Sequence, residues 1–158
     1  MNNRDVAAIL FNISTILTHQ YDNPYRIRAY RRAARNILRS RHSLAERVAN
    51  GQSLGIPQLG TSLTEKISTL ASTGKLPFYE ELCAQLPPEQ QFLMRVPGMG
   101  PTTAARIHND LGRIDAVSLA RAAATGALQR VWGVGPKRTA AIIETLVVPM
   151  LPQSSLSV

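Results

Sequence analysis

The sequence contains three copies of a five-residue phrase in which the first and fourth residues are apolar and the last is glycine. Each copy leads directly into an amphipathic helical stretch. The copies are Ile56-Pro57-Gln58-Leu59-Gly60, Val96-Pro97-Gly98-Met99-Gly100 and Val131-Trp132-Gly133-Val134-Gly135. The second and third copies continue alike, with a proline at the next position. The repeat predicts three tight turns, each leading into a helix.

The glycines and prolines of the phrase favour an anion site at the start of each helix. Glycine in the middle and at the end of the phrase permits positive φ and leaves no Cβ in the path of a ligand. Pro101 and Pro136 occupy the first helical position, where a missing N–H is not needed. The next amides and the positive end of the helix dipole then face solvent, which is an arrangement that binds phosphate. Lys137 and Arg138 oppose that dipole by roughly 0.3–1 kcal/mol each, and a bound phosphate would offset this.

The copies are not equivalent. Gln58 stands where the others have Gly98 and Gly133, so the first turn either strains by roughly 1 kcal/mol at positive φ or adopts a different turn. Trp132 replaces the proline of the other copies, and we interpret it as a packing residue in preference to a base-stacking one. The alternative for all three copies is a set of tight helix connections that bind nothing.

The rest of the chain has helical periodicity, and alternating β-branched runs are absent. This predicts an all-α fold of small helical bundles built around the three turns. Asn23 and Pro24 begin a helix that runs to about Arg39. The pair Pro87-Pro88 separates the expected units, which are residues 1–86 and 87–148, followed by a flexible tail at 149–158.

Basic charge is concentrated on the helix that begins at Pro24. The net charge is +8, and seven arginines lie between Arg26 and Arg41 with no acidic residue among them. Clustered arginine indicates a polyanion such as nucleic acid, ahead of a solvated face or an anionic membrane surface. The core stripe of this helix is expected at Ile27, Tyr30, Ala34, Ile37 and Leu38. The expected contacts with nucleic acid are Arg26, Arg28, Arg31, Arg32, Arg35, Arg39, Gly60, Lys75, Gly98, Gly100, Thr102, Thr103, Gly133, Gly135, Lys137 and Arg138.

Several classes of function are excluded by composition. The single Cys83 makes no internal disulfide, and the scattered histidines form no zinc site with it. No segment approaches the roughly 18–20 apolar residues of a membrane span, and the N-terminus lacks a signal-peptide core. We expect a cytoplasmic, nucleoid-associated protein with no membrane or small-molecule partner.

The repeated phrase resembles the helix-hairpin-helix motif of DNA-binding proteins. Residues 23–34, the first hairpin and residues 73–76 resemble the lyase-type N-terminal domain of family X DNA polymerases, the polymerase beta group. The stretch from Leu93 through the third hairpin resembles the fingers region that follows. No counterpart of the catalytic palm is present in the sequence, so we expect no nucleotide polymerisation by this chain alone.

The resemblance also implies candidate catalytic and cation-binding residues. Lys66 matches the lysine that forms a Schiff base with 5′-deoxyribose phosphate in some members, and Tyr30 matches a site tyrosine. Ser62 and Phe78 replace lysines of lyase-active members. No cofactor is required, but a monovalent cation, K⁺ or Na⁺, is implied at the hairpins. The matching backbone carbonyls are those of Leu54, Ile56, Leu59, Met94, Val96 and Met99.

The sequence therefore predicts a DNA-binding protein that grips phosphate backbone without reading sequence, on gapped, nicked or damaged DNA in repair. One alternative is a 5′-deoxyribose-phosphate or abasic-site lyase that uses Lys66. Another is a non-catalytic scaffold, or the DNA-binding half of a split polymerase, with a separate polymerase or repair protein as partner.

Overall fold

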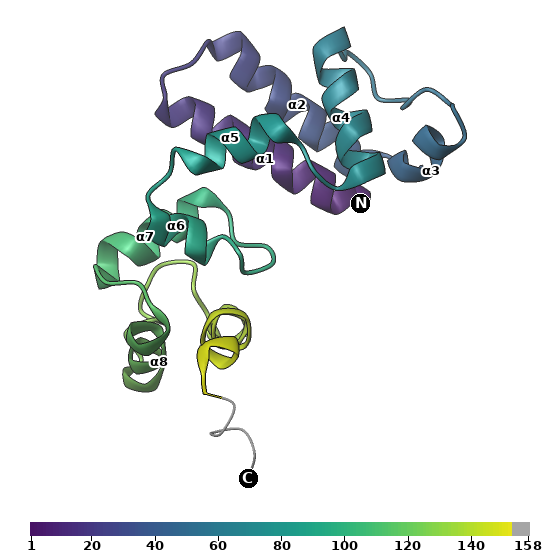
Figure 1. Cartoon of the computed structure of the whole chain (residues 1–158). Helices are drawn as coiled ribbons and strands as arrows, with labels where there is room; N and C mark the ends of the chain where they lie inside the picture. The colour runs from purple at the N-terminus through teal and green to yellow at the C-terminus, as the bar shows by residue number, and fades with distance from the viewer. Residues whose placement is uncertain (153–158) are drawn as a thin grey trace. The chain divides into compact units, whose positions relative to one another are not determined.

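A computed structural model describes residues 1–152, and every element within that range is helical (Figure 1). The all-α class is therefore confirmed. The elements are α1 (Asn3–His19), α2 (Pro24–Arg39), α3 (Leu44–Ala49), α4 (Thr61–Thr73), α5 (Pro77–Ala84), α6 (Pro88–Leu93), α7 (Pro101–Leu111), α8 (Ala116–Thr125), α9 (Pro136–Ile142), the π-helix η1 (Ile143–Val147) and the 3₁₀-helix η2 (Val148–Met150).

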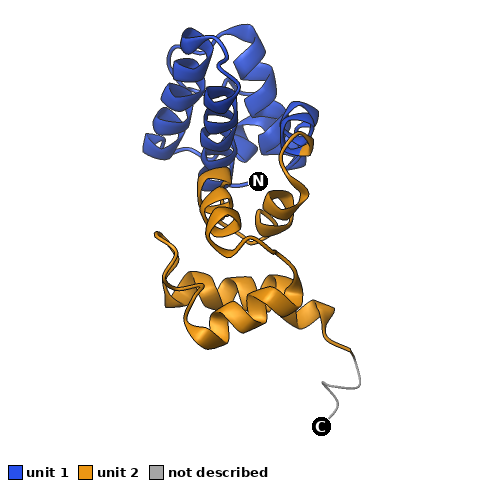
Figure 2. Cartoon of the chain, turned by 90° about the vertical axis from the view of Figure 1, so that its left-hand side faces the viewer, with its two compact units in different colours: residues 1–83 blue, residues 84–158 orange. Residues whose placement is uncertain are grey.

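The chain divides into two compact units, Met1–Cys83 and Ala84–Val158 (Figure 2). The sequence placed this boundary after residue 86, at the proline pair. The segment expected to be a flexible tail, residues 149–158, begins inside η2, and residues 153–158 of it lie outside the described part of the chain.

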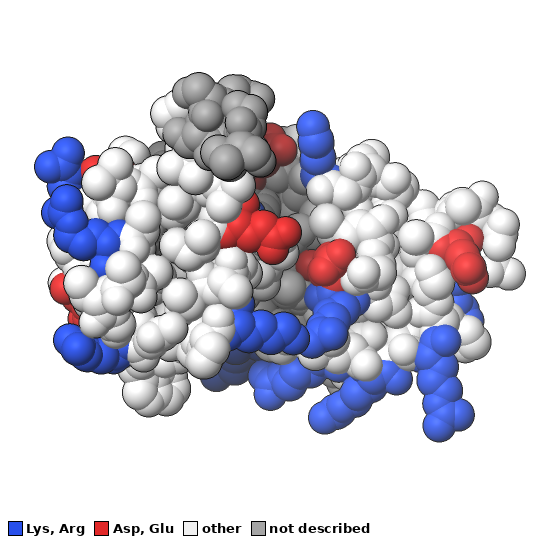
Figure 3. Space-filling model, turned by 90° about the horizontal axis from the view of Figure 1, so that it is seen from below, with Lys and Arg blue, Asp and Glu red and all other residues white. Residues whose placement is uncertain are grey.

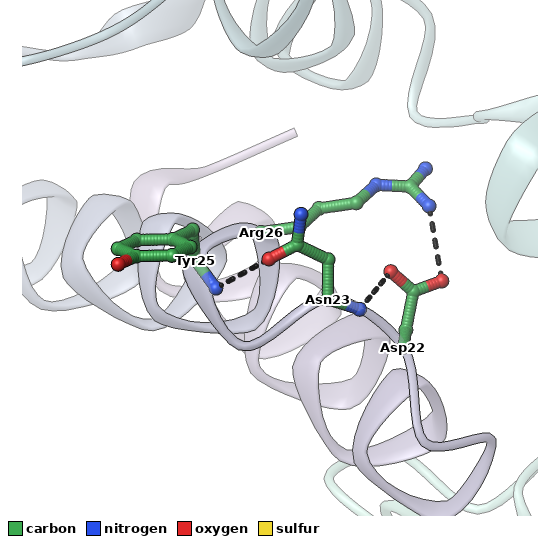
Figure 4. Close-up of polar contacts among 4 residues, drawn as sticks. All are labelled: Asp22, Asn23, Tyr25 and Arg26. Atoms are coloured by element: carbon green, nitrogen blue, oxygen red, sulfur yellow. Dashed lines mark hydrogen bonds and ion pairs between the residues drawn. The ribbon is translucent and has the colours of Figure 1, made fainter.

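Helices α1 and α2 lie side by side and form the framework of the first unit (Figure 1). Helix α2 begins where the sequence predicts. The side chain of Asn23 accepts a hydrogen bond from the Tyr25 amide at 2.9 Å, and the Asp22 carboxylate accepts one from the Asn23 amide at 2.7 Å (Figure 4). These caps satisfy amides that the first turn of a helix leaves without partners.

One residue of the expected core stripe of α2 is exposed. Ile27, Tyr30, Ala34 and Ile37 are buried as expected, and Ala33 joins them, whereas Leu38 is 54% exposed. Each residue turns the helix by about 100°, so the step beyond Ile37 carries Leu38 past the edge of the stripe toward solvent. The placement of Leu38 in the core was wrong.

The three repeats form connections between helices. We name residues 56–60, which lie between α3 and α4, hairpin 1; residues 96–100, between α6 and α7, hairpin 2; and residues 131–135, between α8 and α9, hairpin 3. In hairpins 2 and 3 the alternating apolar residues Val96, Met99, Val131 and Val134 are all at most 4% exposed and belong to the core of the second unit. The residues between them face outward. The core therefore fixes each turn and leaves its tip in solvent.

Candidate nucleic-acid interface

The three turns share one backbone feature at their third residue. The third residue of each has positive φ, at 62° for Gln58, 81° for Gly98 and 88° for Gly133. Hairpin 1 therefore takes the strained alternative: Gln58 adopts the conformation that glycine occupies in the other copies. The Met99 amide donates to the Val96 carbonyl and the Val134 amide to the Val131 carbonyl, both at 3.0 Å.

The last glycine of each hairpin has a different role from the one expected. Gly60, Gly100 and Gly135 have φ of −78°, −92° and −96°, so the expectation of positive φ at these positions was wrong. They are N-cap residues with extended backbone. A Cβ added at Gly60 or Gly135 would meet nothing within 4 Å. The surface at these two helix starts is therefore open to solvent.

The helices that follow the hairpins have N-termini without side-chain caps. In α1, α2, α3 and α8 an Asn, Ser or Asp side chain accepts a hydrogen bond from a first-turn amide. In α4, α7 and α9 no side chain does so, and the first turn holds no acidic residue. The α9 helix continues without a break into η1. Uncapped amides at the positive end of a helix dipole bind anions such as phosphate.

Hairpin 3 is tied to helix α7 by Arg138. Its guanidinium Nη1 atom donates to the Gly133 carbonyl at 3.0 Å and lies 3.5 Å from the Thr103 hydroxyl. Lys137 and Thr102 are exposed. The predicted contact residues of the second and third hairpins therefore come together in one region of the second unit.

Trp132 lies at the exposed tip of hairpin 3. Its side chain is 75% exposed, so its interpretation as a packing residue was wrong. The guanidinium carbon of Arg106 lies 4.3 Å from the centroid of its ring. The phrase places Trp132 between the two buried positions Val131 and Val134, next to a glycine with positive φ, and this directs its side chain away from the core.

The basic residues of α2 divide into a row and its flanks. Arg28, Arg32, Arg35 and Arg39, which we call the arginine row, line a groove of about 300 Å³ together with Asn36. A second groove of about 430 Å³ shares Asn36 and Arg39 and extends to Gly55, Ile56 and Pro57 of hairpin 1 and the loop before it. The two grooves join the arginine row to hairpin 1.

Two of the predicted arginines face away from the row. Arg31 donates to the Thr18 hydroxyl of α1 at 3.2 Å. Arg26 forms an ion pair with Asp22 at 3.2 Å (Figure 4). Lys75, further along the chain, is exposed. Lysine and arginine side chains project from the surface in several places, with fewer acidic side chains between them (Figure 3).

The candidate catalytic residues gather around Phe78, in what we call the Phe78 cluster. The Lys66 Nζ atom lies 5.2 Å, and the Arg26 guanidinium carbon 5.0 Å, from the centroid of the Phe78 ring. Tyr30 stacks on the same ring at 6.3 Å. Lys66 also donates to the Ser62 hydroxyl at 2.7 Å. Lys66 and Tyr30 were expected in one site, and the structure brings them together with Arg26 around Phe78.

Burial sets the chemistry available to Tyr30. The residue is 3% exposed, and burial raises the pKa of its phenol while the nearby Arg26 charge lowers it in part. The net direction is upward, so the hydroxyl stays protonated at neutral pH. A protonated phenol does not serve as a base.

The hairpin carbonyls offer oxygen ligands but no side-chain ligands. Among residues 1–152, no three His, Cys, Asp or Glu side chains lie close enough together to hold a metal ion. The Val96 carbonyl accepts the Met99 amide and retains a second lone pair, because a carbonyl oxygen has two. In hairpin 1 the corresponding Ile56 carbonyl accepts no such bond within the described chain. The monovalent cation expected at these oxygens stays a prediction.

Sequence reasoning missed three residues that shape these surfaces. The sequence identified Phe78 only as a replacement for a lysine of lyase-active members, and it gave no role to Asn36. Arg47 donates to the Ser53 carbonyl at 3.2 Å in the loop before hairpin 1. The sequence around Arg47 does not indicate this hydrogen bond, because it depends on the path that the loop takes in the folded protein.

Within the part of the chain that the structure describes, no helix is long and apolar enough to cross a membrane.

Comparison with known proteins agrees with this geometry. The family described as "Helix-hairpin-helix domain" matches residues 1–76, and the family described as "SAM-like Helix-hairpin-helix tandem" matches residues 56–113 and 91–147. The curated protein "DNA polymerase/3'-5' exonuclease PolX" of Bacillus subtilis (strain 168) is 27% identical over 146 residues, which cover 92% of this chain and 25% of that protein. The chain thus spans about a quarter of the length of this relative. The resemblance to family X polymerases is confirmed, and the matches support DNA as the partner.

Proposed function

Because the chain belongs to the helix-hairpin-helix family, we propose that it binds the phosphate backbone of DNA without reading base sequence. The observation that carries this proposal is the contrast between helix N-termini. The three helices that follow hairpins have neither a side-chain cap nor an acidic residue in the first turn. In contrast, α1, α2, α3 and α8 each have a cap, and α6, which has none, carries Glu89 in its first turn. Uncapped amides take phosphate oxygens and cannot distinguish one base from another.

The arginine row supplies the charge for the same function in the first unit. Arginine forks match phosphate oxygens in pairs, and the row leads to hairpin 1 through the shared grooves. A DNA strand laid along this path would place successive phosphates first on guanidinium groups and then near hairpin 1. The relative from Bacillus subtilis is a DNA polymerase and exonuclease, which supports gapped, nicked or damaged DNA in repair as the substrate class.

The test is a salt titration of affinity for a gapped oligonucleotide. Each phosphate contact contributes about −0.9 to the slope of log K against log salt concentration, so several contacts give a steep loss between roughly 50 and 200 mM salt. Arg32→Ala should make the slope shallower by about 0.9. Arg4→Ala removes the same charge from an exposed position on α1 of the same unit and should leave the slope nearly unchanged.

Three oligonucleotides of unrelated sequence, each with one gap, should bind with similar affinity, and an intact duplex should bind more weakly. Binding that is insensitive to salt would refute the backbone proposal. So would a strong preference for one of the three sequences.

The Phe78 cluster supports a second candidate function, cleavage at a 5′-deoxyribose phosphate or abasic site. The neutral Lys66 amine would attack the sugar aldehyde, and loss of water would give a Schiff base. Loss of a proton from the neighbouring carbon would then expel the 3′ phosphate. Arg26, 5.0 Å from the ring that Lys66 also contacts, would hold a phosphate, and Tyr30 would donate a hydrogen bond.

Borohydride trapping on an abasic oligonucleotide tests this second function. A covalent adduct is expected with the wild-type chain and not with Lys66→Arg, which keeps the charge and therefore the DNA binding. An adduct that persists in Lys66→Arg would assign the chemistry to another amine. Absence of an adduct in the wild type would refute the lyase.

The hairpin carbonyls support a bound monovalent cation as part of the DNA site. At hairpin 1 it would be held by the oxygens of Ile56 and Leu59 and by that of Leu54 in the preceding loop. At hairpin 2 it would be held by those of Val96 and Met99 and by that of Met94 just before the hairpin. The cation would add positive charge where the phosphate approaches, without any side-chain ligand. Replacing K⁺ by a bulky organic cation at constant ionic strength should then weaken DNA binding, and equal affinity in both salts would refute the cation.

A further inference from the structure

We propose that Trp132 and Arg106 form a stacking platform for an unpaired nucleobase, so that hairpin 3 distinguishes DNA with exposed bases from fully paired DNA. The inference rests on the proposed DNA binding and adds a second kind of contact to it. Phosphate contacts alone position a nucleic acid, and a contact with a base face reports whether that base is free.

The exposure of Trp132 is the first observation. The side chain is 75% exposed although Arg106 already covers part of one ring face. The remaining exposed area therefore includes the other face of the indole. A flat partner that covers this face removes apolar surface from water, which is favourable.

The charges around the ring define the partner. Arg106 stacks on the ring, Arg138 binds the Gly133 carbonyl beside it, and Lys137 is exposed in the next helical turn. A ring that stacks on one cation, with a second cation bound to the next residue of the hairpin, fits a ligand that combines a flat aromatic surface with negative charge. A nucleotide has both. Gly135 follows Trp132 by three positions, which places their Cα atoms at most roughly 11 Å apart, so one nucleotide can reach the ring and the end of the hairpin together.

The fixed position of the ring is the third observation. Val131 and Val134 are 2% and 3% exposed and hold hairpin 3 in the core. Arg138 joins the hairpin to Thr103 of α7, the helix that also carries Arg106. The two halves of the platform are therefore held by one framework. A ring that is already in place loses little side-chain freedom when a base stacks on it.

The chain contains a single tryptophan, so its fluorescence reports on this residue alone. The probes are two DNA duplexes with the same single-stranded overhang, one carrying thymines and the other carrying abasic tetrahydrofuran nucleotides of equal charge. Thymine should quench the fluorescence and bind roughly 5- to 150-fold more tightly than the abasic overhang, which corresponds to the stacking of one base on an aromatic side chain. The abasic overhang should bind without quenching.

Trp132→Ala should abolish the difference between the two probes, and Trp132→Phe should retain part of it. Val117→Ala trims another exposed apolar side chain of the same unit, 67% exposed, and should keep the full difference. Equal, salt-dependent binding of both probes by the wild type would overturn the inference, would leave the backbone proposal intact and would favour a protein as the partner of the ring. Absence of binding to either probe would overturn the backbone proposal, and the inference with it.

Discussion

Replacing Gln58 by glycine should stabilise the first unit. Gln58 is an exposed residue with φ of 62°, and the left-handed conformation costs a non-glycine residue about 1–2 kcal/mol. Glycine removes that strain but increases the entropy of the unfolded chain, which opposes folding by about 0.4–1 kcal/mol. The net gain is about 0.5–1 kcal/mol. For a unit of this size that raises the thermal midpoint by about 2–8 °C.

The reciprocal change in hairpin 2 is the matched control. Gly98 has φ of 81°, and a Cβ added there meets nothing within 4 Å, so Gly98→Gln introduces backbone strain without a steric clash. It should destabilise the second unit by about as much as Gln58→Gly stabilises the first. Urea unfolding followed by circular dichroism measures both changes. If Gln58→Gly is neutral or destabilising while Gly98→Gln is clearly destabilising, the assignment of strain to Gln58 is wrong.

Three further predictions concern single positions. Gly135→Ala should change the free energy of unfolding by less than about 1 kcal/mol, because the poorer N-cap and the less flexible unfolded chain have opposite effects. Its DNA affinity should nevertheless fall several-fold, because the added methyl group occupies open space at the helix start. Unchanged affinity would exclude phosphate from this site. Gly55→Ala should destabilise the first unit by about 1–2 kcal/mol, because residue 55 has φ of 69° and an added Cβ would lie 2.9 Å from the Arg47 Nη1 atom. Denaturant unfolding should show a smaller loss for Gly51→Ala, since a Cβ at Gly51 meets nothing within 4 Å. The Ser118 amide and Arg113 lower the pKa of Asp115, the N-cap residue of α8. The stabilising effect of its carboxylate is therefore present above the unfolded-state pKa and is lost as pH falls through the folded-state pKa. The thermal midpoint should fall less on acidification in Asp115→Asn than in the wild type.

Much of the fold follows from local signals in the sequence. Asn23 and Pro24 mark the start of α2, and Gly74 and Gly126 end α4 and α8 in the left-handed conformation, because caps and helix ends are determined by neighbouring residues. The repeated phrase predicted the positions of all three hairpins. These features require no knowledge of distant contacts.

The parts that the sequence did not predict depend on contacts between distant segments. Phe78 lies close to Lys66 and Arg26 only because α5 packs beside α2 and α4. The exposure of Trp132 depends on which residues of the phrase the core of the second unit holds. Composition suggests that a tryptophan packs inside, since large aromatic side chains are highly buried on average. In hairpin 3 the backbone of the turn instead directs the Trp132 side chain into solvent.

Hairpin 1, whose sequence departs from the other two copies of the phrase, also differs from them in its packing. Ile56 and Leu59 of hairpin 1 are only partly buried, unlike their counterparts in hairpins 2 and 3, and Gln58 adds strain at the turn. Hairpin 1 is therefore the most weakly anchored of the three. It is also the hairpin that shares a groove with Arg39 of the arginine row. Guanidinium groups on long side chains adapt to a phosphate position, whereas backbone amides require a fixed one. If the proposed DNA binding is correct, we expect hairpin 1 to tolerate a distorted DNA backbone better than hairpins 2 and 3, whose apolar residues are buried.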